Sequence, residues 1–152
     1  MIETLQTNNV KDLIEIIKIA EKHPNPEYSC DFNTYAKFLL WAFNSPNYLF
    51  FIMKKGELVI GYMILVFIKN IIQNDVVVFD LCLDEEYRKQ GYILNFVKLI
   101  YGLADKYKID NFKWNSYILP EKYWAKFIPC KYHTDTVYII SRNDFLESIG
   151  EK

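Results

Sequence analysis

The sequence predicts a single domain of mixed α/β class that spans residues 1–152. A length of 152 residues matches the ~100–200 residues of one domain, and neither an internal repeat nor a linker divides the chain. Hydrophobic residues make up 51% of the chain and charged residues 24%, a composition that excludes a disordered protein. The spacing of the apolar residues changes along the chain from helical to strand-like and back, which predicts both kinds of element.

Two helices are expected in the first third, after a short strand at residues 2–5. Asn9 is a suitable N-cap, and the apolar residues after it recur at helical spacing: Val10, Leu13, Ile14 and Ile17. Pro24 ends this helix, because proline cannot continue the hydrogen-bond ladder. Asp31 or Asn33 then caps a second helix, whose apolar positions are Tyr35, Phe38, Leu39 and Ala42.

A three-stranded meander is expected in the middle of the chain, at residues 48–53, 58–68 and 76–83. Residues 54–57 form a hairpin turn that contains Gly56, and a polar break at residues 69–75 separates the second strand from the third. The continuous apolar character of these strands indicates that they form the buried centre of a sheet.

The last third alternates helices with strands. A long helix is predicted by apolar residues at helical spacing: Ile93, Phe96, Val97, Ile100, Leu103, Ala104 and Tyr107. A strand at residues 111–117, a short helix at 120–127 with proline in its first turn, and a strand at 136–141 follow. The predicted order of elements is β-α-α-β-β-β-α-β-α-β.

Charge, cysteine content and missing motifs exclude several functions. The net charge of −1 argues against general nucleic-acid binding, which needs clustered cations. The longest apolar stretch, residues 58–68, is shorter than the ~20 residues of a membrane span, and no signal-peptide pattern opens the sequence, so we expect a cytoplasmic protein that contacts no membrane. Three cysteines without a CxxC pair and only two histidines argue against a metal site. GxGxxG, Walker A and GxSxG patterns are absent.

The connection between the strand at 76–83 and the following helix is the strongest signal of a binding site. The first amides of a helix have no partner within the helix, and the helix dipole favours negative charge there. Gly91 lets the backbone approach a ligand closely, and Arg88 adds a positive charge. This combination predicts a site for a phosphate or a pyrophosphate.

The segment FDLCLDEEYRKQGYILNFVKLI, residues 79–100, resembles motif A of the GCN5-related N-acetyltransferases, the GNAT superfamily. In that motif a strand and a short acidic turn precede [QR]-x-x-G-x-[GA] at the start of a helix, and Arg88 and Gly91 match it. The resemblance implies a mixed, mostly antiparallel sheet flanked by helices. It also implies transfer of an acetyl group from acetyl-CoA to an amine, in a small molecule or in a protein. The acceptor and the oligomeric state stay open, a homodimer included.

The resemblance further implies roles for individual residues. Backbone groups of the strand would hold the pantetheine arm, and the turn and helix start would hold the pyrophosphate. These cofactor-binding residues are Leu81, Cys82, Leu83, Arg88, Lys89, Gln90, Gly91, Tyr92 and Ile93. From its apolar surroundings in the sequence we expect Cys82 to be a buried, protonated thiol and not a nucleophile.

Asp80 and Tyr123 are the expected catalytic residues. A base must take a proton from the acceptor amine, whose pKa is ~10.4 if it is of the lysine type. Asp80 is the charged residue of an otherwise apolar strand, and Tyr117 and His133 are the other candidates. Tyr123 lies close to the family's late F-Y-x-K-x-G-F pattern, although Trp124 occupies the place of the usual tyrosine.

Two departures from the family pattern support a second hypothesis, a GNAT-fold protein that has lost catalysis and acts as a binding or structural module. Ile93 stands where the family prefers Gly or Ala, and Val77, which cannot act as a base, stands where many relatives carry Glu or Tyr. An open cleft between residues 80–83 and 111–117 would favour the enzyme. A cleft filled by aromatic rings, with Ile93 packed in the core, would favour the module.

Overall fold

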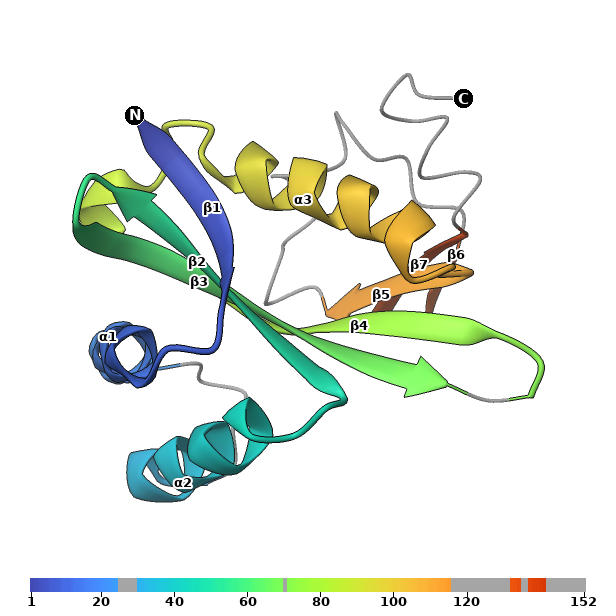
Figure 1. Cartoon of the computed structure of the whole chain (residues 1–152), viewed down its shortest axis with the longest axis horizontal. Helices are drawn as coiled ribbons and strands as arrows, with labels where there is room; N and C mark the ends of the chain where they lie inside the picture. Colours follow the sequence, from blue (N-terminus) through green and yellow to red (C-terminus); the bar gives the residue numbers. More distant parts are fainter. Residues whose placement is uncertain (25–29, 70, 116–131, 135–136, 142–152) are drawn as a thin grey trace.

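The computed structural model describes residues 1–24, 30–69, 71–115, 132–134 and 137–141, and this part of the chain forms one seven-stranded sheet with helices on both faces (Figure 1). The helices are α1 (Val10–Lys22), α2 (Phe32–Phe43), the short 3-10 helix η1 (Glu85–Tyr87) and α3 (Ile93–Lys106). The strands are β1 (Ile2–Thr7), β2 (Tyr48–Lys55), β3 (Leu58–Lys69), β4 (Asn74–Leu83), β5 (Asn111–Asn115), β6 (Tyr132–Thr134) and β7 (Val137–Ser141).

The sheet has the strand order β1-β2-β3-β4-β5-β7-β6. Strands β4 and β5 are parallel, and every other pair of neighbours is antiparallel. The parallel pair follows from the chain path, because α3 connects the end of β4 to the start of β5 and carries the chain back along the sheet. The predicted fold class, a mixed and mostly antiparallel sheet flanked by helices, is confirmed.

Two hydrophobic clusters fill the two sides of the sheet. Helices α1 and α2 cover one face, and α3 covers the other (Figure 1). The cluster under α1 and α2 contains Leu13, Ile16, Leu39, Phe50, Ile52 and Ile64. The cluster under α3 contains Met63, Leu65, Val76, Phe96, Val97 and Leu103. Strand β3 contributes to both, since its alternate side chains point to opposite faces, and this explains its continuous apolar sequence.

A β-bulge in β4 changes which side chains face α2. Ile64 of β3 pairs with Asp80, but the next residue, Leu65, pairs with Val78, so Phe79 is an extra residue in the ladder. Val78 packs in the cluster under α3, whereas Phe79 and Asp80 both contact residues of α2. In a regular strand Asp80 would share a face with Val78. The bulge therefore turns the Asp80 carboxylate away from α3 and toward α1 and α2.

Most predicted elements are present in the structure. The Asn9 side chain accepts a hydrogen bond from the Lys11 amide at 2.9 Å and caps α1. Asp31, and not Asn33, caps α2 by accepting from the Thr34 amide at 2.8 Å. Strand β6 was not predicted, because three residues are too few to show a period. The predicted helix at 120–127 and the end of the predicted strand at 111–117 lie outside the described residues.

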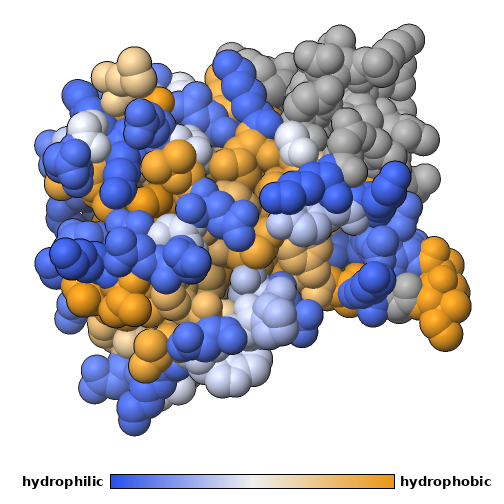
Figure 2. All heavy atoms as spheres, viewed as in Figure 1, coloured by the Kyte–Doolittle hydropathy of each residue, from blue (hydrophilic) through white to orange (hydrophobic). Residues whose placement is uncertain are grey.

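Apolar side chains are exposed at the tip of the β3–β4 hairpin, at the right edge of Figure 2. Ile71 and Ile72 are almost fully accessible there. This apolar tip lies at the opposite end of β4 from Leu83 and from the start of α3. Among the described helices, none combines the length and the apolar character needed to span a membrane.

Candidate functional site

The turn between β4 and α3 has two residues in left-handed backbone conformations. Lys89 has a φ of 62° and Gly91 a φ of 80°. Glycine adopts this conformation without strain, which explains Gly91 at this position. The Gln90 side chain closes the turn by donating to the Glu86 carbonyl at 2.8 Å. A Cβ placed on Gly91 would meet nothing within 4 Å, so the space beside this residue is open to a ligand.

The start of α3 presents a row of backbone amides. Tyr92 is the N-cap residue and makes no capping hydrogen bond with its side chain. Within the described part of the chain, the amide N–H groups of residues 89–93 donate to no acceptor, whereas Leu94 and Asn95 donate to the Gly91 and Tyr92 carbonyls. These amides and the positive end of the helix dipole together form a region that attracts anions.

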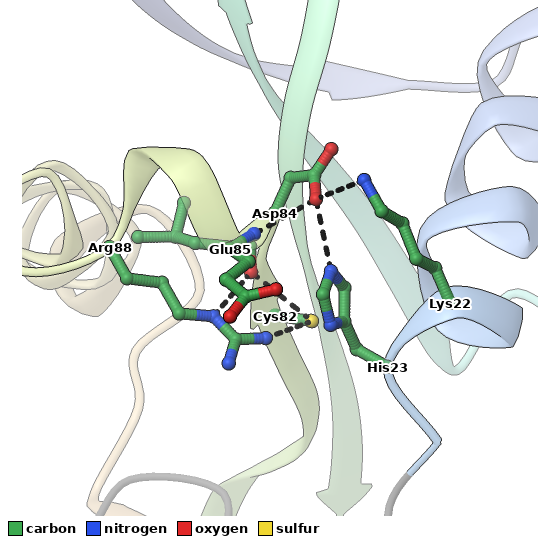
Figure 3. A network of polar contacts seen from close by, with 7 residues as sticks. Lys22, His23, Cys82, Asp84, Glu85 and Arg88 are labelled. Carbon is green, nitrogen blue, oxygen red and sulfur yellow. Dashed lines mark hydrogen bonds and ion pairs between the residues drawn. The ribbon is translucent and has the colours of Figure 1, made fainter.

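Arg88 lies against the end of β4, as Figure 3 shows. Its Nε donates to the Leu83 carbonyl at 2.8 Å, and its Nη2 lies 3.7 Å from the Cys82 Sγ. The Leu83 contact holds the guanidinium beside the strand end, while the residue as a whole stays exposed. Arg88 therefore adds a positive charge at the end of β4, on the residue that precedes the amides of residues 89–93 in the chain.

Cys82 is half-buried, and its thiol donates weakly to the Leu83 carbonyl at 3.6 Å. Burial and the nearby Asp80 carboxylate raise the pKa of Cys82 from 9.0 to about 11, although Arg88 favours the thiolate. This agrees with the expectation of a protonated thiol.

Cys82 is predicted to react with thiol reagents more slowly than a free cysteine, because the thiolate is the reactive species. In the native protein at pH 7.5, iodoacetamide should label Cys82 at least about tenfold more slowly than it labels free cysteine. The exposed Cys30 serves as an internal control and should react at close to the free rate. Labelling of Cys82 as fast as that of Cys30 would contradict the prediction.

Asp84 links the end of α1 to the end of β4 (Figure 3). Its Oδ1 accepts from Lys22 Nζ at 2.8 Å and from the Glu85 amide at 2.8 Å, and it lies 3.0 Å from His23 Nε2. Burial opposes ionisation, but the hydrogen bonds from Lys22, His23 and the Glu85 amide outweigh it and lower the pKa of Asp84 from 3.8 to about 2. The network fixes α1 relative to the turn before α3.

Replacing Asp84 with Asn is predicted to destabilise the protein by about 1–2 kcal/mol at pH 7, a value reduced for the partial exposure of the group. A lowered folded-state pKa gives stability that is complete above the unfolded pKa and is lost as the pH falls toward the folded pKa. The difference between wild type and Asp84→Asn should therefore be constant above about pH 5 and shrink between pH 5 and 2. Urea unfolding over this pH range tests the prediction, and a difference that grows at low pH would contradict it.

Asp80 lies on the face of the sheet that α1 and α2 cover, and only 6% of its surface is exposed. Its Oδ2 accepts hydrogen bonds from the hydroxyls of Tyr35 in α2 and Tyr62 in β3, the latter at 2.8 Å. Its Oδ1 accepts from the Leu81 amide at 2.8 Å. These hydrogen bonds tie the Asp80 carboxyl group to α2, to β3 and to its own strand.

A small cavity of about 70 Å³ opens beside Asp80. Asp80 and Tyr62 come from the sheet, and the rest of the lining comes from the end of α1 and the start of α2: Ala20, His23, Pro24, Cys30, Asp31, Phe32 and Tyr35. The last part of β4 connects the cavity to the turn before α3. Asp80 lines the cavity, and Leu83, three residues further along the strand, contacts Arg88 of the turn.

One edge of β4 is only partly used in the sheet. The parallel pairing with β5 runs from Asp75–Asn111 to Val78–Trp114. Beyond the bulge, residues 80–83 pair with β3, and within the described residues no pairing with β5 continues there. The Leu81 amide there donates to Asp80 Oδ1 and the Leu83 carbonyl accepts from Arg88 Nε, so a further partner on this edge would have to use other backbone groups of residues 81–83.

The structure brings most of the predicted site residues to the last part of β4 and the start of α3. Tyr117 and Tyr123 lie outside the described residues, and His133 lies in β6, on the far side of β5 and β7 from β4. Sequence reasoning did not find Tyr35, Tyr62 and His23 as site residues. Within the described residues, no group of His, Cys, Asp and Glu is arranged to hold a metal ion.

Ile93 has one feature expected of the non-catalytic module, a packed side chain, and one expected of the enzyme, a backbone amide at the helix start that is free to bind an anion. Its side chain is half-buried and packs against the cluster under α3. Its amide is nevertheless among those of the helix start that donate to no acceptor within the described residues. Core packing by the side chain thus leaves the Ile93 amide without an acceptor among the described residues, so Ile93 does not by itself favour the non-catalytic module.

Comparison with known proteins identifies the family. The model of the acetyltransferase (GNAT) family matches residues 13–114, whereas no curated protein matches the chain. Among solved structures, a GNAT-family protein from Desulfovibrio desulfuricans superposes with a TM-score of 0.73 at 7% identity, over 93% of this chain and 99% of that one. A predicted acetyltransferase with acetyl-CoA from Clostridium acetobutylicum gives 0.68 at 10% identity, over 89% and 92%.

The same fold occurs in FeeM, an N-acyl amino acid synthase from uncultured soil microbes, with a TM-score of 0.68 at 11% identity over 97% of this chain and 94% of that one. At these identities the structural matches show a shared fold. The family model covers about two thirds of the chain, including both the Asp80 cavity and the turn before α3. The chain belongs to the acetyltransferase (GNAT) family.

Proposed function

We propose that the protein transfers an acetyl group from acetyl-CoA to an amine. Membership of the GNAT family supports an acyltransferase. The observation that carries the proposal is the set of amides at residues 89–93 that donate to no acceptor in the described residues, in the turn that leads from β4 and η1 into α3 and directly after Arg88, whose guanidinium is held at the end of β4. A pyrophosphate matches this arrangement, because it needs several donors and positive charge at one place.

The coenzyme is proposed to follow the end of β4. Its pyrophosphate would accept from the amides of residues 89–93, and the open space beside Gly91 would let it approach the backbone. The amide groups of the pantetheine arm would pair with the edge of β4 at Leu81, Cys82 and Leu83, as an added strand does. A structural neighbour from Clostridium acetobutylicum was solved with acetyl-CoA, which supports this choice of donor.

The transfer requires two proton movements. The lone pair of a neutral amine attacks the thioester carbonyl carbon and forms the C–N bond. The C–S bond then breaks, and the sulfur leaves with the bonding electron pair and takes up a proton. An amine that binds as ammonium first gives one proton to the solvent and becomes neutral. After the attack the nitrogen loses a second proton, for which Asp80 is the proposed acceptor, since its carboxylate lines a cavity. Tyr123, the other expected catalytic residue, lies outside the described residues.

Arg88→Ala is predicted to weaken acetyl-CoA binding by about 1–3 kcal/mol, or roughly 5- to 150-fold, the scale of a charge-assisted hydrogen bond. Lys106→Ala is the matched control, because Lys106 is an exposed cation in the last turn of the same helix. Calorimetry measures both affinities, and thermal unfolding checks that loss of the Arg88–Leu83 contact leaves the fold intact.

The amide resonances of residues 89–93 give an independent test of the same site. Addition of acetyl-CoA should shift them, while the resonances at the end of α3 stay in place. If millimolar acetyl-CoA leaves residues 89–93 unmoved, or if Arg88→Ala binds as tightly as Lys106→Ala, the proposed pyrophosphate site is wrong.

A further inference from the structure

The cavity beside Asp80 has an acidic and aromatic lining. Two carboxylates, Asp80 and Asp31, belong to it, and no lysine or arginine is among the described residues that line it. His23 also lines it, but its Nε2 is directed to Asp84 at 3.0 Å. The walls include three aromatic rings, from Phe32, Tyr35 and Tyr62. Negative charge surrounded by aromatic faces is the environment that selects an organic cation.

The size of the cavity limits what can enter it. Its volume of about 70 Å³ is well below the roughly 300–1,000 Å³ of pockets that hold a whole drug-sized ligand. It therefore has room for the end of a ligand only. An amino group on a CH2 group is narrow enough for such a space, whereas an α-amino group on a branched carbon carries further substituents that need more room.

We infer that this cavity binds the acceptor as a primary ammonium group at the end of an unbranched alkyl chain, with Asp80 as its counter-ion and the aromatic rings as its walls. The inference rests on the proposed function, because it names the class of amine that the protein acetylates. It selects alkylamines and diamines over peptide α-amino groups and ring-bound amino groups.

The position of Asp80 on β4 explains how the bound amine reaches the donor. Asp80 is two residues from Cys82, a separation of about 7 Å along a strand. The bulge at Phe79 directs the Asp80 side chain toward α2, while the backbone edge of Leu81–Leu83 stays in the plane of the sheet. An amine bound at Asp80 on the face of β4 therefore lies close to a thioester held along its edge.

Binding to the free protein tests the inference without acetyl transfer. The probes are n-propylammonium, 1-propanol, which has a similar shape and no charge, and isopropylammonium, which is branched at the amine-bearing carbon. The amide resonances of Leu81 and Tyr35 report binding. We expect n-propylammonium to bind at least about tenfold more tightly than either other probe, the scale of one charge-assisted hydrogen bond. Equal affinities for n-propylammonium and 1-propanol, or no shift of these resonances, would overturn the inference.

Two substitutions test whether the preference for n-propylammonium over 1-propanol comes from this cavity. Asp80→Asn should remove the preference for ammonium over alcohol, and Asp75→Asn, a change to another buried carboxylate of β4, should keep it. Asp31→Asn is the second variant in case Asp80→Asn does not fold, since asparagine caps a helix as well as aspartate does. It should weaken n-propylammonium binding about two- to fivefold and leave 1-propanol unchanged. An unchanged preference in either Asp80→Asn or Asp31→Asn would overturn the inference.

Measurements of acetyl-CoA binding and of n-propylammonium binding on the same protein show whether this inference or the proposed function has failed. If acetyl-CoA binds and some other amine is acetylated, but the cavity has no preference for n-propylammonium, the inference is wrong and the proposed function stands. If n-propylammonium binds as expected but acetyl-CoA does not bind at all, the proposed function is wrong.

Discussion

Asp80→Asn is expected to lower kcat for acetyl transfer by about 10²–10⁴-fold, the usual contribution of general acid–base catalysis. Asparagine has nearly the same shape but cannot accept the proton that the amine loses. The affinity for acetyl-CoA should change less than about threefold, because the proposed coenzyme contacts are backbone groups and Arg88. Release of the CoA thiol, measured with the amine that the protein acetylates fastest, gives kcat, and calorimetry gives the affinity.

The control for Asp80→Asn is Asp75→Asn. Asp75 is also buried in β4, with 3% of its surface exposed, and it pairs with Lys113 at 2.7 Å. Its loss should reduce stability, since it leaves a lysine without its partner, and should leave kcat within about threefold of wild type. A comparable loss of kcat in both variants would show that general destabilisation causes the effect, and a fully active Asp80→Asn would exclude Asp80 as the proton acceptor.

Gly61→Ala is expected to destabilise the protein by about 1–3 kcal/mol, the usual cost of overpacking a core. A Cβ at this position would lie 2.5 Å from the Leu83 Cδ2 and 2.8 Å from the Cys82 carbonyl oxygen. Gly61 pairs with Leu83 in the sheet, so β3 and β4 would have to separate at the end of β4 that the proposed coenzyme follows. Urea unfolding measures the loss of stability, and acetyl-CoA affinity should fall with it.

Gly102→Ala is the matched control for Gly61→Ala. Gly102 lies in α3, is exposed, and a Cβ there would meet nothing within 4 Å. Alanine is the better helix former, so this change should stabilise the protein by about 0.5–1 kcal/mol. The two glycine substitutions thus have opposite expected signs, and a neutral or stabilising Gly61→Ala would show that β3 and β4 are less tightly packed than described.

The sequence predicts the elements well where the apolar period is long. The helical spacing after Asn9 and Asp31 and the continuous apolar run of β3 identify α1, α2 and the centre of the sheet. The bulge at Phe79 is not visible in the sequence, because the run FDLCL fits a regular strand equally well. Its effect on the site is large, since it decides on which face of the sheet Asp80 lies.

The candidate site can be predicted only in part from the sequence, because several of its contacts join residues that are far apart in the chain. Asp80 is identified by its charge within an apolar strand, and the turn from Arg88 to Gly91 by its motif. The partners of Asp80 are Tyr35 and Tyr62, which are 45 and 18 residues away and are two of 12 tyrosines. His23 meets Asp84 across 61 residues. Contacts that tertiary folding creates between such distant residues leave no local pattern in the sequence.

Calorimetric titration of the wild-type protein with acetyl-CoA tests the central claim most directly. The account expects one molecule of acetyl-CoA per chain, with a dissociation constant between about 1 μM and 1 mM, the range in which enzymes usually bind their substrates. Binding should be competed by CoA, and the amides of residues 89–93 should shift with the same affinity. Absence of binding at 1 mM acetyl-CoA, in a protein that is folded by its thermal transition, would contradict the account.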